Sequence, residues 1–332
     1  MPSPTGWHVN WTDPPVNTNT HIMNAYIYIA FNEEAQQYLI ENLPKEIKPL
    51  FRTALPKEQQ EEAFRKADLL LGNPPPAWLQ QTPSTLQFWQ LSSAGFNQYE
   101  DLQLNIQVAN MGDFFARPCA ETIVGGVLAF YRGIHTLTRW QTQKHWQGEQ
   151  LRASLRLLGQ QQAVVLGAGA IGKYVKQMLS GFGCAIRMAA RTNPLAEIHS
   201  REDLLKTLKH TKLVINTLPG SAEKYVNAEV FDALPDGAVY ASVGRGETTD
   251  EQALINALRA GKLAGAVLDV TEREPLPVDS SLWNMDNVIL TQHTGGGKAD
   301  ESLGIAAQFI TNVDHFLKKE PLEDKVELSR GY

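Results

Sequence analysis

A glycine-rich turn between an apolar run and a helical pattern limits the folds open to this chain more than any other sequence feature. The turn, residues 167–172, reads Gly-Ala-Gly-Ala-Ile-Gly and directly follows the apolar run 163–166. In this pattern the first glycine permits a tight turn, the second lets backbone N–H groups approach a pyrophosphate, and the third lets the helix pack closely on the strand. Gly167, Gly169 and Gly172 hold these positions. The sequence therefore predicts a dinucleotide site at the positive end of the helix that follows the turn.

A nucleotide-hydrolysing loop is the main alternative for the same residues. Gly167 to Lys173 also fit the P-loop spacing Gly-x-x-x-x-Gly-Lys. That loop requires a Ser or Thr hydroxyl next to ligate Mg²⁺, and this chain has Tyr174 there. The strand before the turn and the helix after it favour the dinucleotide site.

Strand and helix patterns alternate along most of the chain, which indicates mostly parallel, doubly wound sheets. In the first half the predicted strands are 25–31, 68–71, 86–91 and 106–109, and the predicted helices are 33–43 and 57–66. In the second half the predicted strands are 163–166, 185–189, 213–216, 238–242, 264–268 and 288–290. A long helix that opens at Pro118 enters the second half, and a helix at 301–318 crosses back. We expect two α/β domains, 1–117 completed by 300–332, and a dinucleotide-binding domain at 118–299.

Composition excludes several classes of protein. The 332 residues are 43% hydrophobic, enough for a core in each domain, and 30 Lys+Arg against 36 Asp+Glu give a net charge of −6. This charge offers no field for nucleic acid or an anionic membrane. The longest apolar stretch, 123–131, is too short to span a bilayer, and no signal-peptide pattern opens the chain. Cys119 and Cys184 form no disulfide framework, so we expect a cytosolic protein. Residues 1–23 are predicted to be an irregular extension.

The end of the strand after the glycine turn indicates which dinucleotide is bound. NAD enzymes place an acidic residue there for the ribose 2′-OH. This strand is followed by Ala190-Arg191-Thr192-Asn193, with no carboxylate to repel a 2′-phosphate. Arg191 is suited to pair with that phosphate, and Thr192 or Asn193 to donate a hydrogen bond, so NADPH is favoured over NADH. The alternative is that Arg191 is a solvated residue at a strand end.

Three further segments follow predicted strands of the second domain, where ligands bind in open α/β sheets. The segments are 242–247, 268–277 and 287–296, and they contain Arg245, Glu274 and His293 respectively. An arginine at this edge can hold a 2-oxo acid by its carboxylate and polarise the carbonyl oxygen. A histidinium ion supported by a carboxylate can protonate that oxygen while a hydride arrives. The alternatives are a loop cation, a surface carboxylate with neighbouring Glu272 as the true partner, and a structural histidine.

These motifs resemble those of the D-isomer-specific 2-hydroxyacid dehydrogenases, and within them the glyoxylate/hydroxypyruvate reductase branch. The glycine turn, the Arg-Gly segment, the Glu-Pro-Leu-Pro segment and the Thr-x-His segment occur in the family's order. The resemblance covers nearly all of the second domain and the first domain more loosely. It implies that Arg245 binds substrate, that Glu274 supports the histidine, and that His293 is the acid/base. Ser242 and Gln292 depart from the family, which often has Asn and Pro there, and we expect neither to remove activity.

The resemblance also implies a Rossmann fold for the second domain, a flavodoxin-like first domain that binds substrate, and further site residues. The expected cofactor contacts are Gly167, Gly169, Ala170, Ile171, Gly172, Arg191, Thr192, Leu218, Pro219, Val243, Asp269, His293 and Gly295. The expected substrate contacts are Leu71, Gly72, Ala94, Gly95, Arg245 and His293. Asp269 is placed near the nicotinamide or the catalytic histidine, with a structural strand-end role as the alternative. No metal motif is visible, because His199, His210 and His315 lack ligand spacing, and we expect catalysis without a metal.

The implied reaction is NADPH-dependent reduction of glyoxylate or hydroxypyruvate to the 2-hydroxy acid. The implied assembly is a homodimer formed through the cofactor domain, with Trp140 and Trp146 packing at its interface or capping a neighbour's pocket. Two alternatives remain open. One is a dehydrogenase for phosphoglycerate, D-lactate or a branched acid, and the other is a dinucleotide-sensing, corepressor-like binding protein.

Overall fold

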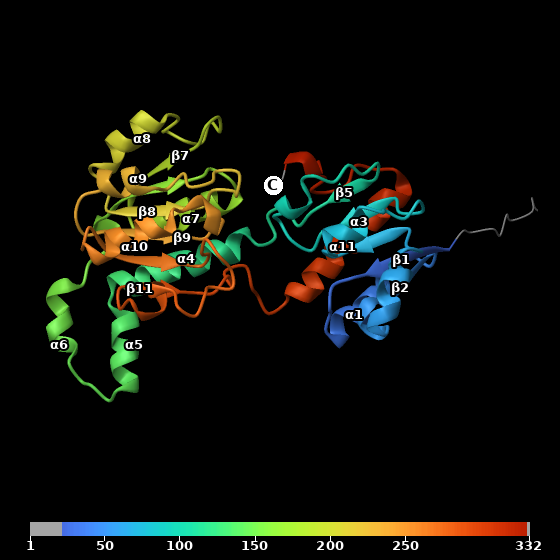
Figure 1. The fold of residues 1–332 in the computed structure, drawn as a ribbon, viewed down its shortest axis with the longest axis horizontal. Helices are drawn as coiled ribbons and strands as arrows, with labels where there is room; N and C mark the ends of the chain where they lie inside the picture. The colour runs from blue at the N-terminus through green and yellow to red at the C-terminus, as the bar shows by residue number, and fades with distance from the viewer. Residues whose placement is uncertain (1–21, 331–332) are drawn as a thin grey trace, which may run out of the picture.

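Two parallel sheets, each within its own lobe, form the framework of the structure (Figure 1). The structure is a computed structural model and describes residues 22–330. The irregular extension predicted for residues 1–23 lies almost wholly outside the described residues. In both sheets every strand runs parallel to its neighbours, so all strands of a sheet end at one edge.

The first sheet has the order β2-β1-β3-β4-β5, which is the flavodoxin-like order. Its strands are β1 (Met23–Ile27), β2 (Ile47–Phe51), β3 (Leu69–Leu71), β4 (Phe88–Gln90) and β5 (Gln107–Ala109). Its helices are α1 (Glu33–Asn42), α2 (Gln60–Phe64), α3 (Pro76–Leu79) and, from the end of the chain, α11 (Glu301–Lys318). The Asn32 side chain begins α1 by accepting a hydrogen bond from the Ala35 backbone N–H.

Several elements of the first domain differ from the sequence prediction: β1 covers Met23–Ile27 rather than 25–31, and the short helix α3 was not predicted. Strand β2 was not predicted, because Lys48 and Pro49 interrupt its apolar pattern. Proline is accepted there since β2 is an edge strand that pairs only with β1. The helix expected over 57–66 is instead a 3-10 turn at Lys57–Gln59 followed by the short α2.

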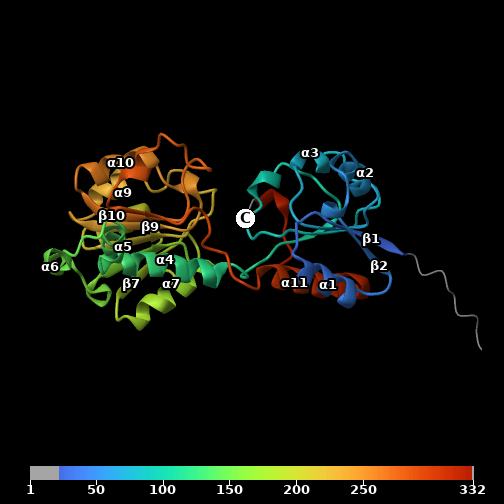
Figure 2. The ribbon, with the colours of Figure 1, turned by 90° about the horizontal axis from the view of Figure 1, so that it is seen from below.

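Helix α11 packs on the first sheet although it follows the second sheet in sequence. Figure 2 shows it beside α1 beneath the strands. Its residues Ile305, Phe309 and Val313 are fully buried, and the Phe309 ring stacks on Phe88 of β4 with 6.1 Å between centroids. Burial of these side chains stabilises the association of α11 with the first domain by about 1.5–3 kcal/mol each.

The second sheet has the order β11-β10-β9-β8-β6-β7. Its strands are β6 (Gln162–Leu166), β7 (Ala185–Ala189), β8 (Leu213–Asn216), β9 (Ala238–Ser242), β10 (Leu263–Leu268) and β11 (Val288–Leu290). A single bridge between Ala189 and Ile198 stands where a Rossmann sheet has its third strand. The strand order reverses between β6 and β8, and ligands of open α/β sheets bind at the carboxyl side of such a reversal.

Helices cover both faces of this sheet (Figure 2). One face carries α4 (Ala116–Tyr131) and α7 (Ala170–Gly181), and the other carries α8 (Arg201–Leu208), α9 (Ala228–Ala233) and α10 (Glu251–Arg259). The first turn of α4 contains the expected domain boundary at residue 117. Two further helices, α5 (Ile134–Thr142) and α6 (Gly148–Leu151), project from this domain as an arm (Figure 1).

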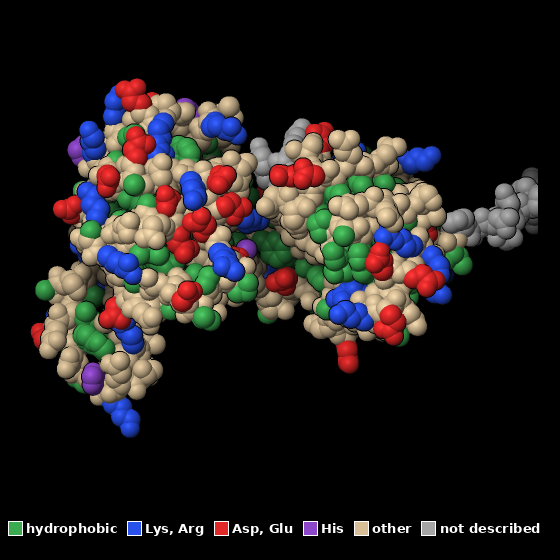
Figure 3. Space-filling model, in the orientation of Figure 1, with side chains coloured by type: hydrophobic (Ala, Val, Ile, Leu, Met, Phe, Trp, Pro, Cys, Tyr) green, Lys and Arg blue, Asp and Glu red, His purple; other side chains and the backbone are tan. Residues whose placement is uncertain are grey.

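The surface carries interspersed acidic and basic side chains and is hollowed between the two lobes (Figure 3). Among residues 22–330, no helix combines the length and the apolar character needed to cross a bilayer. The expectation of a cytosolic protein without nucleic-acid or membrane partners stays a prediction.

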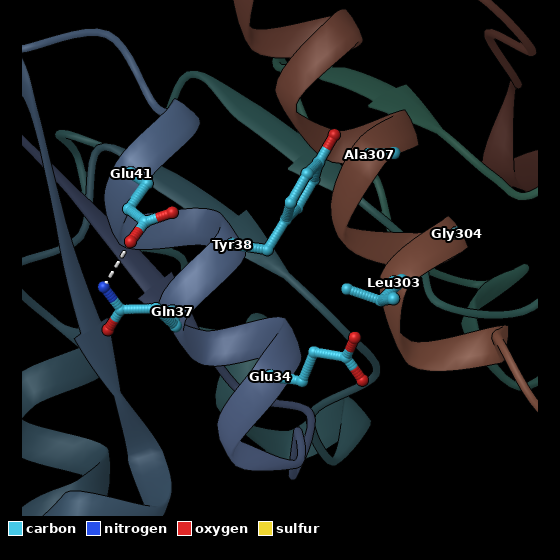
Figure 4. A pocket seen from close by; sticks show the side chains of 7 residues that line it. All are labelled: Glu34, Gln37, Tyr38, Glu41, Leu303, Gly304 and Ala307. Atoms are coloured by element: carbon cyan, nitrogen blue, oxygen red, sulfur yellow. Dashed lines mark hydrogen bonds between the residues drawn. The ribbon is translucent and has the colours of Figure 1, made fainter.

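A groove of about 530 Å³ lies between α1 and α11 (Figure 4). Tyr38 of α1 points toward α11, where Leu303 and Ala307 complete an apolar floor. On α1, Gln37 donates a hydrogen bond to Glu41 at 2.6 Å. The groove lies between two helices that pack on one face of the first sheet.

Candidate active site

The glycine turn has the geometry that a pyrophosphate requires. Gly167 adopts a φ of +103°, and a Cβ there would lie 2.5 Å from Oγ1 of Thr217. A Cβ on Gly172 would overlap the carbonyl oxygen of Gly167, so the helix reaches the strand only because this side chain is absent. Gly169 faces open space at the start of α7. The residues therefore leave room for phosphates beside backbone N–H groups at the end of a helix.

The loop after β7 carries an arginine, Arg191. Arg191 and Thr192 are exposed, and within the described residues Arg191 has no acidic partner. Asn193, which sequence offered together with Thr192 as a donor to that phosphate, makes two hydrogen bonds within the protein. Its Nδ2 donates to the Ala168 carbonyl at 2.9 Å, and its Oδ1 accepts from the Leu195 N–H. Asn193 therefore ties this loop to the glycine turn.

Arg245 follows β9 and reaches across to the first domain. Its Nη1 donates to the Gly244 carbonyl at 2.9 Å, and a Cβ on Gly95 would overlap its Nη2. A glycine at 95 is thus required for the guanidinium group to reach this loop. The expected substrate residues Gly95 and Arg245 therefore lie in contact, at the point where the two domains meet.

Two asparagines that sequence reasoning missed shape the first-domain side of this site. Asn73, after β3, accepts from the Ser92 N–H at 3.0 Å and donates to the Ser93 hydroxyl at 2.8 Å. Asn110, after β5, donates to the Ala94 carbonyl at 2.6 Å. Their position in the sequence could have identified them, because each asparagine follows a strand at the carboxyl edge of the first sheet. These bonds hold the loop that carries Ala94 and Gly95.

Of the other two expected substrate residues, only Gly72 lies in a loop. It has a φ of +112° and follows directly after β3. Leu71 is fully buried in β3, and its carbonyl accepts from the Tyr28 N–H at 2.8 Å. Leu71 therefore presents neither its side chain nor its carbonyl to the cleft, since both belong to the sheet.

His293 and Glu274 form a hydrogen-bonded pair. Nδ1 of His293 donates to Oε2 of Glu274 at 2.5 Å, and the other carboxylate oxygen accepts from the Thr271 N–H at 3.0 Å. The His293 side chain is 51% exposed, so Nε2 is the nitrogen left for a ligand. Glu272 instead pairs with Lys224 at 3.2 Å and accepts from the Glu251 N–H. The geometry thus separates two neighbouring carboxylates that sequence could not separate.

The backbone that presents His293 is held by Asp269. Gln292 and His293 have φ values of 53° and 54°, a region that costs free energy for residues other than glycine. The His293 N–H donates to the Asp269 carbonyl at 2.6 Å. Oδ1 of Asp269 accepts from the Thr291 hydroxyl at 2.6 Å and from the Gly295 N–H at 3.0 Å. Asp269 is buried and holds the loop that carries His293.

The remaining expected cofactor residues follow the carboxyl ends of β6, β8, β9 and β11. Leu218 and Pro219 follow β8 and are half-buried, and a Cβ on Gly244 would overlap the Leu218 carbonyl. Val243 is buried, and the Gly295 carbonyl accepts from the Thr122 hydroxyl at 3.2 Å. Ala170 and Ile171 are half-buried at the start of α7.

A cysteine nucleophile does not fit this site. Burial, reinforced by the negative charge of Asp269, raises the pKa of Cys119 to about 11, although Arg245 acts in the opposite sense. The thiol is therefore protonated at neutral pH and unreactive. Within residues 22–330, no group of three or more His, Cys, Asp or Glu side chains is arranged to hold a metal.

The fold and the glycine turn define a two-domain α/β protein with a dinucleotide site next to an arginine and a carboxylate–histidine pair. Residues 124–295, more than half of the chain, match the family model described as D-isomer specific 2-hydroxyacid dehydrogenase, NAD binding domain. The chain belongs to the D-isomer specific 2-hydroxyacid dehydrogenase family.

Individual relatives add detail. The chain is 36% identical over 175 residues to glyoxylate/hydroxypyruvate reductase A of Salmonella heidelberg (strain SL476), a match covering 51% of this chain and 55% of that protein. The match thus spans about half the length of this curated relative. A D-isomer specific 2-hydroxyacid dehydrogenase from Xanthobacter autotrophicus Py2, solved with NADPH and MES, is 27% identical, with a TM-score of 0.78 over 93% of this chain and 99% of that one.

A third likeness bears on the fold alone. The NADPH-dependent glyoxylate/hydroxypyruvate reductase of Sinorhizobium meliloti, solved with NADP and sulfate, is 20% identical. Its TM-score is 0.79, and the match covers 93% of this chain and all of that one. The two-domain architecture is therefore shared along nearly the whole chain.

Proposed function

We propose that this protein reduces a small 2-oxo acid, glyoxylate or hydroxypyruvate, to the 2-hydroxy acid with NADPH. The observation that carries the proposal is the His293–Glu274 pair. It lies at the carboxyl edge of the second sheet, where Arg245 and the glycine turn also lie. The Salmonella relative is named for the reduction of the same two substrates. The glycine turn and the loops that carry Arg245 and His293 lie within residues 124–295, the region that matches the family model.

The residues divide the work of the reaction among them. Arg245 binds the substrate carboxylate and donates to the carbonyl oxygen, which fixes and polarises the acceptor carbon. Glu274 holds Nδ1 of His293, so the proton passes from Nε2 to the carbonyl oxygen. NADPH, held at the glycine turn, would supply the hydride that reduces that carbon. His293 then regains a proton from solvent, to which half of its side chain is exposed.

Steady-state kinetics on a panel of 2-oxo acids tests this function. The panel contains glyoxylate, hydroxypyruvate, phosphohydroxypyruvate, pyruvate and a branched 2-oxo acid. We expect the highest kcat/KM for glyoxylate or hydroxypyruvate. A higher value for another acid moves the assignment to that substrate. Bound NADPH with no oxidation on any of the acids contradicts the enzyme and favours a dinucleotide-sensing protein.

The same panel run with both cofactors, on wild type and Arg191→Ala, tests the choice of NADPH. We expect kcat/KM to be higher with NADPH than with NADH. Arg191→Ala loses one charge-assisted contact to the 2′-phosphate. The ratio of kcat/KM with NADPH to kcat/KM with NADH should therefore fall about 10- to 100-fold in this variant. Arg187→Ala is the matched control, because Arg187 is an exposed arginine on β7, the strand that leads into the Arg191 loop. A wild-type ratio near or below one contradicts the proposal.

We also propose a homodimer that forms through the projecting arm. Ile134 and Leu137 of α5 are 49% and 39% exposed, and Trp146 in the following loop is 100% exposed. Apolar side chains gathered on a projecting segment are typical of an interface. Light scattering should give a particle mass of about twice the chain mass of 36.9 kDa. In Leu137→Asp the measured mass should fall to that of one chain. A wild-type mass of one chain contradicts the dimer, and Thr142→Asp at the end of α5 serves as control.

A further inference from the structure

A buried polar network lies beneath the loops that follow β8 and β9. At its centre is Asn216, the last residue of β8, whose side chain is 0% exposed. Its Nδ2 donates to the Thr248 hydroxyl at 2.7 Å and to the Tyr240 hydroxyl at 2.9 Å, and its Oδ1 accepts from the Leu218 N–H at 3.0 Å. A buried amide with all of these groups satisfied has one fixed orientation.

The network reaches the substrate arginine through Thr248. The Thr248 hydroxyl donates to the Arg245 carbonyl at 2.5 Å while it accepts from Asn216. The Thr248 N–H donates to the same carbonyl at 3.2 Å, which closes the 3-10 turn Gly246–Thr248 directly after the arginine. The backbone at Arg245 is therefore fixed by a side chain that is itself fixed by Asn216.

At its other end the network reaches the glycine turn. Thr217 lies between Asn216 and Leu218, and its hydroxyl donates to the Leu166 carbonyl at 2.8 Å, just before the turn. The backbones of the two loops also touch, because a Cβ on Gly244 would overlap the Leu218 carbonyl. A continuous series of contacts thus joins the glycine turn to the loop after β8 and to Arg245.

We propose that Asn216 and Thr248 are positioning residues that set Arg245 relative to the bound dinucleotide, so that the cofactor loop and the substrate arginine move as one unit. This inference rests on the proposed function, since it assigns both loops their ligands. An amide suits the role because it offers two donors and an acceptor on one planar group. The other interpretation is that the network only stabilises the ends of two strands.

Thr249 separates these interpretations because its hydroxyl belongs to the same network without touching either loop backbone. It is buried, and its Oγ1 lies 2.6 Å from the Tyr240 hydroxyl. Thr248→Val and Thr249→Val each delete one buried hydroxyl from adjacent positions without changing side-chain size. Both variants should lose a similar amount of thermal stability, which serves as the shared structural cost.

Steady-state kinetics then measures the positioning role. Thr248→Val should raise KM for the 2-oxo acid and lower kcat, with kcat/KM falling about 5- to 15-fold, the effect of one lost hydrogen bond. Thr249→Val should stay within about twofold of wild type. In an Arg245→Ala background the Thr248 change should add less than about twofold, because two residues acting through one contact are not additive. Equal losses in both valine variants, or full additivity with Arg245→Ala, overturn the inference.

Hydrogen–deuterium exchange gives a readout that needs no turnover. In wild type and in Thr249→Val, NADPH should slow exchange of amides at 217–220 and also at 244–248. In Thr248→Val the first segment should stay protected, and the protection of the second should fall several-fold. Protection of 244–248 by NADPH that is unchanged in Thr248→Val overturns the inference whatever the panel shows. A wild type that passes this test but reduces no 2-oxo acid contradicts the proposed function alone.

Discussion

Replacing His293 with asparagine should lower kcat about 10²- to 10⁴-fold, which is the range that a general acid contributes. In the proposed reaction Glu274 holds Nδ1 of His293, and Nε2 delivers the proton to the substrate. Asparagine has no group that releases a proton at neutral pH. It is preferred to alanine here because His293 has a φ of 54°, a conformation that asparagine tolerates well.

The fold should survive this change. His293 is half-exposed, and the contact that holds its backbone is the N–H bond to the Asp269 carbonyl, which asparagine keeps. Kinetics with saturating NADPH measures kcat, and a thermal melt measures the stability of the fold. His210→Asn is the matched control, because His210 is exposed near the end of α8. A kcat within about threefold of wild type would remove His293 from the chemistry.

The strands of the second domain could be predicted from sequence to within one residue at each end. Strands β8, β9 and β11 begin and end where their apolar runs do; β8 and β9 are fully buried, and β11 is a half-buried strand at the edge of the sheet. The first domain was harder because β3, β4 and β5 have only three residues each. Its edge strand β2 is broken by a lysine and a proline, so no apolar period marks it.

Some side chains of the site could be predicted from local motifs, and others depend on how the chain folds. Arg245 and His293 stand in local motifs, so their residue types and positions are visible in the sequence. The choice of Glu274 over Glu272 depends on how the loop after β10 folds back on His293, and no local pattern contains that distance. Asn73 acts on a loop about twenty residues away and Asn216 on one about thirty away. Such partners are set by the order of strands in the sheet.

Replacing Arg245 with alanine should lower kcat/KM for the 2-oxo acid about 30- to 5,000-fold, which corresponds to about 2–5 kcal/mol for losing one partner of a hydrogen-bonded charge pair. Most of the change should appear in KM for the acid, because the carboxylate loses the group that binds it. KM for NADPH should change little, since the glycine turn and Arg191 are left intact. The kcat/KM of Arg245→Lys should lie between those of wild type and Arg245→Ala, because an ammonium group keeps the charge but cannot bind a carboxylate in bidentate fashion.

The close fit of Arg245 against Gly95 offers a sharper form of the same experiment. Removing the guanidinium group leaves a space bounded by the Gly95 loop and the Gly244 carbonyl, the two groups it contacts. Added guanidinium ion should occupy that space and restore part of kcat/KM in Arg245→Ala in a saturable way, whereas ammonium ion should restore less. Arg259→Ala, an exposed arginine at the end of α10, controls for general salt effects. An alanine variant with an unchanged KM for the acid would place substrate recognition elsewhere in the cleft, and equal rescue by both ions would reduce the role of Arg245 to charge alone.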